Sequence, residues 1–377
     1  MANNNNTKNL NVPNLRFPEF KGEWEKSLLG QIADITKGSG ISKEQLSNQG
    51  TPCILYGELY TKYKSEIINE VYSKTTLNPS SLVKSQANDV IIPCSGETAI
   101  DISTARCVPY NNILLGGDLN IIQLKSQDGG FFAYQLNGVR KYDIARIAQG
   151  VSVVHLYGEN LKRIKVCYPT VEEQRKITSL LSLIDERIST QNKIIEDLKN
   201  LKSALLDLLF QNNNKWATYC IGDVLTIGNG KDYKHLKKGN IPVYGTGGYM
   251  LSVDNYLHEG ESVCIGRKGT IDMPMFLTGK FWTVDTLFYT YNFRNIFPKF
   301  CYYLFTMINW QRYSEASGVP SLSKATIEKI KVSVPGLNEQ EHICSILDSI
   351  NNKIDIERTI LAKLKEQKSY LLRQMFI

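Results

Sequence analysis

Glycine-rich loops with polar or basic side chains are the segments of this chain best suited to chemistry, and that chemistry is binding. In the second half they are Tyr244–Tyr249 (YGTGGY) and Gly266–Thr270 (GRKGT), with the basic stretch Lys231–Lys238 nearby in the sequence. In the first half they are Thr36–Gly40 (TKGSG), Tyr56–Glu58 (YGE) and Ser95–Thr98 (SGET). Glycine lets a backbone approach a phosphate or a groove wall, while arginine and lysine bind phosphate or guanine. The loops therefore predict nucleic-acid contacts, with ordinary tight turns as the alternative interpretation.

The side chains of these loops form two candidate sets, one in each half of the chain. The first set is Lys37, Tyr56, Glu58, Ser95 and Thr98. The second set is Thr246, Tyr249, Arg267 and Lys268. The 20 tyrosines of the chain could stack on bases as well as fill cores, and we expect most of them in cores.

Sequence motifs for catalysis are absent. No G-x-x-x-x-G-K-[ST], G-x-S-x-G or H-E-x-x-H occurs, and Gly228–Lys231 lacks the spacing and the hydroxyl of the first motif. The Asn-Pro-Pro-aromatic loop with which amino-methyltransferases hold a flipped base is also missing. The four histidines stand apart from one another and the eight cysteines form no C-x-x-C pair. We therefore expect reduced, buried cysteines, no metal site and no catalytic residue.

The formal net charge of +7 comes from residues outside two long segments, which are themselves almost neutral. Residues 171–210 carry six basic and seven acidic side chains, and residues 338–377 carry six of each. The positive excess therefore belongs to the globular parts. Such an excess suits a polyanion such as nucleic acid, although an ordinary solvated basic surface has the same composition.

The composition, 42% hydrophobic and 21% charged, is ordinary for a soluble globular protein. No apolar run approaches the length of about 18 residues that a membrane-spanning helix needs. The segment MANNNNTKNLNVPNL lacks the hydrophobic stretch of a signal peptide. We expect no membrane association and a cytoplasmic location, with residues 1–15 as a flexible tail.

An internal repeat reveals the elements that must position the loops. Pro169–Phe210 aligns without a gap to Pro335–Phe376. The identical positions include Pro169/Pro335, Glu173/Glu339, Gln174/Gln340, Ile177/Ile343, Leu181/Leu347, Ile184/Ile350 and Phe210/Phe376. Upstream, Trp24 and Gly30 have the same spacing as Trp216 and Gly222. The chain is therefore predicted to be two copies of one unit, each a globular domain followed by a long helix.

Both repeated segments are expected to be helices whose apolar seams bury each other. Neither 171–210 nor 338–377 contains glycine or proline, and apolar residues recur at steps of three and four. Rods of about 40 residues would each be roughly 60 Å long. Globular domains at opposite ends require the helices to run antiparallel. We therefore predict an α+β fold in which two mixed α/β domains are joined by two long antiparallel coiled-coil helices in a pseudo-two-fold arrangement.

The predicted boundaries follow from the repeat. They are a tail (1–15), a first globular domain (16–168), a central helical region (169–212), a second globular domain (213–334) and a C-terminal helical region (335–377). Runs such as Asp89–Pro93 and Phe281–Asp285 alternate with Gly, Asn and Pro turns and indicate strand-rich domains. Each domain is also expected to contain one helix, at 129–146 and at 298–314.

A longer motif ends each globular domain and opens each helix. The first copy is Gly150–Ser152, Ile164–Val166, Pro169, Glu172–Ile177 and Ile184–Asp185. The second copy is Gly318–Val319, Ile330–Val332, Pro335, Glu339–Ile343 and Ile350, with departures at Pro320, His342 and Asn351. This pattern resembles the specificity subunit of type I restriction-modification systems, and the resemblance covers essentially all of residues 16–377.

The resemblance implies a DNA-reading subunit without catalysis of its own. Members of that family have two target recognition domains, each of which reads one half of a bipartite, asymmetric DNA sequence. Their helices set the spacer between the halves and dock modification subunits. Two modification subunits, which bind S-adenosylmethionine and methylate adenine, and up to two restriction subunits, which use ATP and Mg²⁺, would join this chain on double-stranded DNA. Partner contacts are expected along the helices and at Glu173, Gln174, Glu339 and Gln340.

Two alternatives remain open on the sequence. One is a non-catalytic coiled-coil protein that bridges two proteins without binding DNA, which salt-dependent DNA binding would exclude. The other is a catalytic enzyme fused to a coiled coil, which methyltransferase activity of the chain alone would reveal. No motif in the sequence specifies the DNA target, the spacer length or the methylated adenines.

Overall fold

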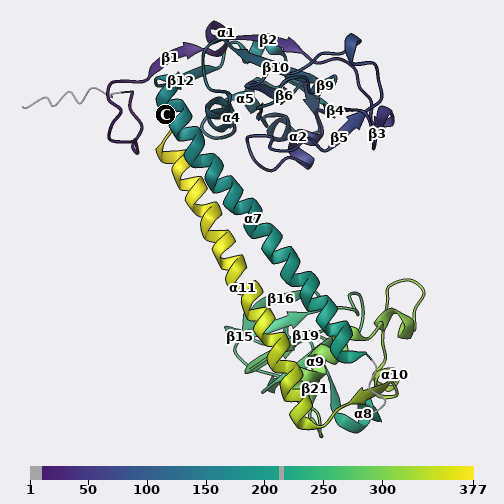
Figure 1. The fold of residues 1–377 in the computed structure, drawn as a ribbon. Helices are drawn as coiled ribbons and strands as arrows, with labels where there is room; N and C mark the ends of the chain where they lie inside the picture. Colours follow the sequence, from purple (N-terminus) through teal and green to yellow (C-terminus); the bar gives the residue numbers. More distant parts are fainter. Residues whose placement is uncertain (1–10, 212–215) are drawn as a thin grey trace, which may run out of the picture. The chain divides into compact units, whose positions relative to one another are not determined.

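The structure, a computed structural model, describes residues 11–211 and 216–377 and divides into two compact units (Figure 1). Unit 1 comprises the chain up to Asn192 together with Thr359–Ile377, and unit 2 comprises Lys193–Arg358. The two long helices, α7 (Val171–Phe210) and α11 (Leu337–Gln374), are each shared between the units. The predicted α+β class and both predicted long helices are confirmed. Each unit therefore contains one sheet-rich part and a stretch of both helices.

The sheet-rich part of unit 1 contains two four-stranded sheets and two short strand pairs. Its strands are β1 (Glu25–Leu28), β2 (Ala33–Lys37), β3 (Leu46–Ser47), β4 (Thr51–Ile54), β5 (Ser73–Thr75), β6 (Asp89–Pro93), β7 (Ser95–Gly96), β8 (Arg106–Val108), β9 (Leu114–Leu115), β10 (Leu119–Leu124), β11 (Val154–His155) and β12 (Lys165–Tyr168). One sheet has the order β2–β10–β6–β8, and the other has the order β3–β5–β4–β9. Its short helices are α1 (Leu29–Ile32), η1 (Lys43–Gln45), α2 (Glu58–Thr61), η2 (Pro79–Ser81), α3 (Ala99–Ile102), α4 (Gly129–Asn137), α5 (Lys141–Ile147) and α6 (Gly158–Leu161).

The sheet-rich part of unit 2 has the same kind of construction. Its strands are β13 (Ala217–Cys220), β14 (Thr226–Asn229), β15 (Lys238–Gly245), β16 (Gly248–Val253), β17 (His258–Glu259), β18 (Ser262–Gly266), β19 (Met275–Leu277), β20 (Lys280–Thr283), β21 (Leu287–Tyr291) and β22 (Lys331–Val334). The sheet orders are β14–β21–β18–β19 and β16–β15–β20–β17. Its short helices are α8 (Ile221–Val224), α9 (Pro298–Met307), η3 (Trp310–Tyr313) and α10 (Lys324–Glu328).

The internal repeat of the sequence is also a repeat of topology. In each unit the first sheet is antiparallel, and its strands follow the same order along the chain, so β2, β10, β6 and β8 match β14, β21, β18 and β19. Each second sheet contains one parallel pair, β4–β9 in unit 1 and β15–β20 in unit 2. The loops that connect these strands differ in length and sequence. The two units therefore share a framework and differ in what the framework displays.

A strand pair closes each sheet-rich part where the chain enters and leaves it. Strand β1 pairs antiparallel with β12, and β13 pairs antiparallel with β22. Next to each pair a glycine allows close approach: a Cβ at Gly30 would stand 2.7 Å from the Cβ of Lys162, and one at Gly222 would stand 3.2 Å from the Cβ of Glu328. The repeated Trp-to-Gly spacing in the sequence thus marks a backbone contact that a larger side chain would obstruct.

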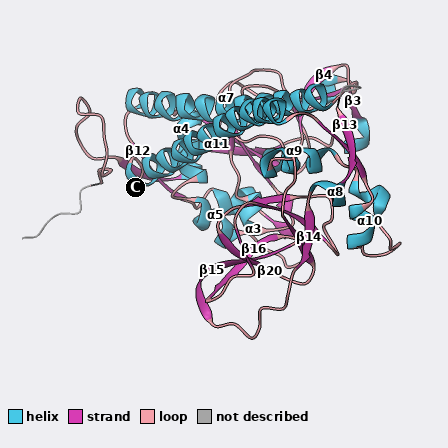
Figure 2. Cartoon of the chain, turned by 90° about the horizontal axis from the view of Figure 1, so that it is seen from below, coloured by secondary structure: helices cyan, strands magenta, loops and turns pink. Residues whose placement is uncertain are grey.

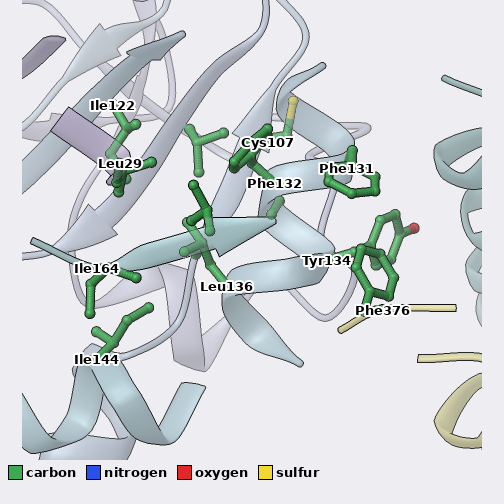
Figure 3. Packing of buried hydrophobic residues seen from close by; sticks show 14 of the residues in the cluster. Leu29, Cys107, Ile122, Phe131, Phe132, Tyr134, Leu136, Ile144, Ile164 and Phe376 are labelled. Atoms are coloured by element: carbon green, nitrogen blue, oxygen red, sulfur yellow. The ribbon is translucent and has the colours of Figure 1, made fainter. Parts of the chain in front are cut away.

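The core of unit 1 is formed around α4, whose first eight residues are buried (Figure 3). Phe131 of α4 packs edge-on against Trp24 with ring centres 5.6 Å apart, and against Phe376 at 5.1 Å. Phe376 follows α11, so the final residues of that helix join the core of the first sheet-rich part. Such buried aromatic pairs add to the burial of apolar surface, which is the main stabilising term.

The helices predicted at 129–146 and 298–314 are each broken in two. In the first, α4 and α5 are separated at Gly138, whose φ of −88° and ψ of −108° are not helical. In the second, α9 ends at Met307 and the buried ring of Trp310 folds back to donate to the carbonyl oxygen of Phe305 at 2.9 Å. The apolar periodicity continues across both breaks, so it could not reveal them.

Within unit 1, α7 and α11 run antiparallel and are joined by buried charges. The ammonium of Lys368 lies 2.6 Å from Asp185 of α7 and 2.6 Å from Glu66 of the sheet-rich part. The hydroxyl of Tyr134 on α4 donates to Asp185 at 2.8 Å, and the Lys368 ammonium lies over the Tyr134 ring at 5.5 Å. Arg106 is buried nearby and donates to the carbonyl oxygens of Leu59 and Tyr63. Because four of these groups are charged and little exposed, each depends on the others for its stability.

Within unit 2 the same two helices pack mainly through apolar side chains. Leu205, Leu206, Leu209 and Phe210 of α7 pack against a cluster that includes Ile343 and Leu347 of α11. Phe210 stacks on Phe300 of α9 at 5.3 Å. Tyr303 of α9 occupies the position of Tyr134 and contacts Asp348 and Asn351 of α11. The repeat thus places an asparagine, Asn351, where the first copy has Asp185.

The first described residues are bound to unit 1, which corrects part of the predicted tail. The amide of Leu15 donates to the carbonyl oxygen of Gln374, and the amide of Trp24 donates to that of Asn11. Arg16 forms two hydrogen bonds of 2.7 Å with the carboxylate of Glu173. Asn-rich composition suggested a loose segment as far as residue 15, but these contacts fix residues 11–16. Residues 1–10 of the predicted tail lie outside the described residues.

Candidate nucleic-acid interface

Two of the loops predicted in unit 1 meet at the side chain of Tyr60. The hydroxyl oxygen of Tyr60 would lie 3.8 Å from a Cβ added at Gly57 and 3.7 Å from one added at Gly96. Burial raises the pKa of this hydroxyl above its usual value, so it remains a hydrogen-bond donor at neutral pH. Sequence reasoning missed Tyr60, because nothing distinguishes it from the other tyrosines along the chain.

Three predicted residues of unit 1 remain accessible around these loops. Lys37 is the last residue of β2 and is exposed. Its charge lowers the pKa of the Cys94 thiol, but burial has the larger effect and raises that pKa to about 11. Tyr56 is half-buried. Thr98 is exposed, although its hydroxyl also caps α3 by accepting from the amide of Asp101 at 3.1 Å.

Glu58 and Ser95 have structural roles instead, and we remove them from the candidate set. Glu58 is buried at the start of α2, where its carboxylate accepts from the Leu55 amide at 3.0 Å, from Lys62 at 2.6 Å and from Ser73. Ser95 is buried and its hydroxyl donates to Asp118 at 3.2 Å. A loop sequence does not show whether a polar side chain points outward or satisfies the backbone of its own turn.

The structure brings the predicted loops of unit 2 together. Thr246 lies in the turn between β15 and β16, and its hydroxyl oxygen would be 3.7 Å from a Cβ added at Gly269. Gly269 belongs to the GRKGT loop after β18, in which Arg267 and Lys268 are both exposed. Tyr249 is 62% exposed, and the hydroxyls of Tyr249 and Ser252 are 3.1 Å apart. An exposed aromatic face on β16 and two exposed cations in a neighbouring loop suit contacts with bases and phosphates.

A basic groove lies along β15 and β16. Figure 2 shows these two strands side by side. It has a volume of about 650 Å³, and Tyr233, Tyr249 and Met250 line it together with lysines. These lysines, all exposed, are Lys234, Lys237 and Lys238. The sequence signalled them as the basic stretch 231–238, but only the fold places that stretch beside Tyr249. No ion pair joins any of the three lysines to a carboxylate within the described residues, so their charges are available to an anion.

A second repeated loop lies next to the recognition loops in each unit. In unit 1, β7 pairs with β11, which follows the Gly150 loop, and Gly150 has a φ of +119°. In unit 2 the Gly269 amide donates to the carbonyl oxygen of Pro320 at 2.9 Å. The valine that follows each motif glycine is exposed, completely at Val151 and by 56% at Val319. The Gly-Val motif therefore places an apolar tip at the same point of both surfaces.

The residues predicted to contact partners are largely internal. Gln174 accepts from the Asp128 amide at 2.9 Å and donates to the carbonyl oxygen of Pro169 at 2.8 Å. Gln340 makes the matching bonds to the Phe297 amide at 2.8 Å and to Pro335 at 2.9 Å. Each glutamine thus fastens its long helix to the start of a domain helix, α4 or α9.

The two glutamates beside these glutamines differ in their partners. Glu173 is buried and paired with Arg16, while Glu339 is exposed and accepts from the indole of Trp216 at 3.1 Å. Glu173, Gln174 and Gln340 are buried and bonded within the chain. These internal contacts, and not contacts with a partner, explain why the repeat has the same residue types at these positions.

The comparisons with known proteins agree with this geometry. The profile of the type I restriction modification DNA specificity domain matches residues 21–200 and 213–366, one match for each half of the chain. The chain belongs to this specificity-subunit family. Its members are the non-catalytic subunits of type I restriction-modification systems, and the family's role in DNA recognition and in association with other subunits applies to this chain.

Individual relatives support the assignment along the whole chain. The type I restriction enzyme MjaVIII specificity subunit of Methanocaldococcus jannaschii is 22% identical over 95% of this chain and 92% of its own length. A putative type I specificity subunit of Haemophilus influenzae is 28% identical, over 41% of each chain. The crystal structure of the type I system S subunit from M. genitalium superposes with a TM-score of 0.69 at 20% identity, covering 97% of this chain and 99% of that one. That likeness shows the shared fold.

The described residues contain no group of three or more His, Cys, Asp or Glu side chains arranged to hold a metal ion. Among the same residues, no helix combines the length and the apolarity needed to cross a membrane.

Proposed function

We propose that each unit of this specificity subunit reads one half of a bipartite, asymmetric double-stranded DNA sequence. The observation that carries the proposal is the repeat of one framework with two different loop surfaces. Unit 1 offers Lys37, Tyr56 and Thr98, whereas unit 2 offers a lysine-lined groove with Tyr249 and Arg267. Two equivalent frameworks with unlike side chains suit two unlike half-sites, because base-edge contacts carry sequence information while phosphate contacts only fix position.

The helices α7 and α11 are proposed to set the spacer between the half-sites. A helix of about 40 residues extends for roughly 60 Å, which is the length of about 18 base pairs. The glutamine fastenings at Gln174 and Gln340 attach each sheet-rich part rigidly to a helix end, which is what a fixed spacing requires.

The modification subunits are proposed to dock on the exposed apolar side chains of the helices. In unit 1 these are Leu183, Ile360 and Tyr370, and in unit 2 they are Ile194, Leu201, Leu208, Leu337 and Ile356. Apolar side chains that remain exposed on a long helix are suited to a partner helix. They replace Glu173, Gln174 and Gln340, which the chain itself buries.

The remaining expectations for the complex follow the family. We propose two modification subunits and up to two restriction subunits on each chain, in the cytoplasm. S-adenosylmethionine, ATP and Mg²⁺ would be bound by those subunits, and this chain would bind none of them.

Methylome sequencing tests the proposal directly. The chain is expressed with its cognate modification subunit in a host free of DNA methylation, and adenine methylation is mapped. A new motif with two half-sites and a fixed gap is expected. Arg267→Ala should relax or change one half-site and leave the other unaltered. A motif without a gap, or one in which both halves change, would contradict the assignment of one half-site to each unit.

A bridging protein without DNA binding remains the competing function, and a binding measurement separates the two. The purified assembly should bind duplex DNA with an affinity that falls steeply with salt concentration, since phosphate contacts release counterions. An assembled, soluble complex that neither binds DNA nor methylates it would favour the bridging function.

A further inference from the structure

A second basic concavity lies in unit 1, and none of the candidate loop residues lines it. It has a volume of about 830 Å³ and lies between the β1–β12 strand pair and α5. Its cationic side chains are Lys26, Arg140, Arg146, Arg163 and Lys165. A single carboxylate, Asp143, lines it and pairs with Arg140 at 3.6 Å and with Arg146 at 3.3 Å. Positive charge therefore dominates the site.

The strand register explains why these cations gather on one face. Lys26 of β1 lies opposite Cys167 of β12, and Leu28 lies opposite Lys165. Alternate residues of a strand share a face, so all four side chains lie on the same side of this strand pair. Lys26, Arg163 and Lys165 are exposed and have no ion-pair partner among the described residues. Their charges are free to meet an anion that enters from solvent.

The floor of the concavity is apolar, which distinguishes it from a phosphate-binding surface. Leu28 is 39% exposed, and the half-buried Ile147 also lines the site. Arg140 is held at the wall because it donates to the backbone carbonyl oxygen of Ile377 at 2.8 Å. A duplex backbone presents only anionic and sugar groups at regular spacing and has no apolar group to fill such a floor. An acidic protein segment with an apolar side chain fits both the rim and the floor.

The described residues of unit 2 do not repeat this cluster of cations, although the framework is the same. The matching positions on β13 are Thr218 for Lys26 and Cys220 for Leu28. Only Lys329 and Lys331 remain, at the positions of Arg163 and Lys165, and η3 stands in the place of α5. A partner that uses the concavity would therefore contact unit 1 and not the equivalent surface of unit 2.

We propose that this concavity, between β1–β12 and α5 of unit 1, binds an acidic, amphipathic segment of a partner protein. The site goes beyond DNA recognition and does not depend on it, because it uses none of the recognition loops. It would let one copy of a partner be distinguished from a second copy bound elsewhere on the chain.

The test uses the full-length chain and a fluorescein-labelled synthetic peptide of glutamate and leucine, designed as an amphipathic helix. Fluorescence anisotropy should show binding that weakens with salt, and the double substitution R163E/K165E should weaken it by at least about tenfold. The matched control K329E/K331E, at the equivalent positions of unit 2, should bind the peptide like the unaltered chain. A lysine and leucine peptide of the same pattern should not bind.

Two outcomes would overturn the proposal. In one, R163E/K165E binds the acidic peptide as tightly as the unaltered chain does, or no chain binds it. In the other, R163E/K165E leaves peptide binding intact and weakens the affinity for a short DNA duplex, which would make the concavity a DNA contact. Circular dichroism spectra that match the unaltered chain establish that the variants are folded. Loss of the bipartite methylation motif with intact peptide binding would refute the proposed function alone.

Discussion

The ammonium of Lys368 lies 2.6 Å from the carboxylate of Asp185. The two residues are 183 positions apart in the sequence, and all of unit 2 lies between them. The same ammonium lies 2.6 Å from Glu66, so one cation joins α11, α7 and the sheet-rich part of unit 1. In the sequence repeat Lys202 corresponds to Lys368, and Asn351 corresponds to Asp185. The helix repeat is therefore symmetric in shape and asymmetric in buried charge.

Replacing Lys368 with methionine should destabilise unit 1 strongly. The substitution keeps the apolar stem but leaves the carboxylates of Glu66 and Asp185 buried without their cation, which typically costs about 3–5 kcal/mol. Urea denaturation should show this loss of unfolding free energy. Lys202→Met, the matched change in unit 2, should cost clearly less, and equal losses for the two variants would contradict the role given to the Lys368 cluster.

The Asp185→Asn variant should change how stability depends on pH. Burial and the nearby Glu66 carboxylate raise the pKa of Asp185 to about 6, whereas an unfolded aspartate titrates near 4. The folded chain binds this proton more tightly, so the contribution of Asp185 to the unfolding free energy declines as pH rises from about 4 to about 6.

Asparagine cannot titrate, so the advantage of the variant over the unaltered chain should grow across that interval and level off above it. Unfolding free energies measured at a series of pH values check this. Glu66 has the opposite dependence, because Lys368 lowers its pKa despite burial, but Glu66 is present in both proteins. A difference between the two proteins that stays constant from pH 4 to pH 6 would show that Asp185 titrates normally.

Replacing Gln340 with alanine should loosen α11 from the sheet-rich part of unit 2. The change removes hydrogen bonds to Phe297, Asn295 and Pro335 and leaves the buried carbonyl oxygen of Pro335 without this donor, at a cost of about 1–3 kcal/mol. Glu341→Ala, at the exposed neighbouring position, is the control and should change stability little. Hydrogen exchange should be faster at the start of α9 in the Gln340 variant, and unchanged protection there would argue against the fastening role.

Replacing Lys234, Lys237 and Lys238 with glutamine should weaken DNA binding and its dependence on salt. If all three contact phosphates, the slope of log affinity against log salt concentration should fall in magnitude by about 3. Titrations of a duplex at several salt concentrations measure the slope. The control K329Q/K331Q removes Lys329 at the end of α10 and Lys331 of β22 and should preserve the slope. A slope that responds equally to both sets of substitutions would mean that charge alone, without the groove, governs affinity.

Lengthening both long helices by one heptad should change the spacer of the DNA target and preserve both half-sites. Inserted after Asn192 and after Arg358, seven residues add about 10 Å, or about 3 base pairs. Equal insertions keep the apolar seams in register. Methylome sequencing of the lengthened chain gives the new gap directly. An unchanged gap would mean that the helices do not measure the spacer.

The long helices and the duplication were predictable because their signals are local and periodic. Ile177 and Ile343 lie on apolar seams that can be read without any tertiary information, and Trp24 and Trp216 mark matching positions. The breaks at Gly138 and after Met307 were missed because the hydrophobic pattern continues through them. The Asn137-Gly138 pair is a turn signal that could have revealed the first break, whereas the second depends on the packing of Trp310.

The candidate surfaces were predictable in part, as loops but not as individual side chains. The Gly-basic loops of unit 2 meet as expected, and Arg267 is exposed. Glu58 and Gln174 look equally polar in the sequence, yet both satisfy internal hydrogen bonds. Lys368 and Glu66 are the clearest omission, because no sequence pattern connects a helix residue to a loop so far away along the chain.

The strand pair that closes each sheet-rich part affects how the protein can evolve. Glu25 faces Tyr168 across β1 and β12, and Ala217 faces Val334 across β13 and β22, so the chain enters and leaves each recognition domain at one point. A segment whose two ends are neighbours can be replaced by another with the same ends, because the rest of the molecule does not have to rearrange. A repeated helix segment follows each of these domains and provides an equivalent attachment point. If each sheet-rich part reads one half-site as proposed, exchange of one such segment would give a new DNA specificity in a single step, without inactive intermediates.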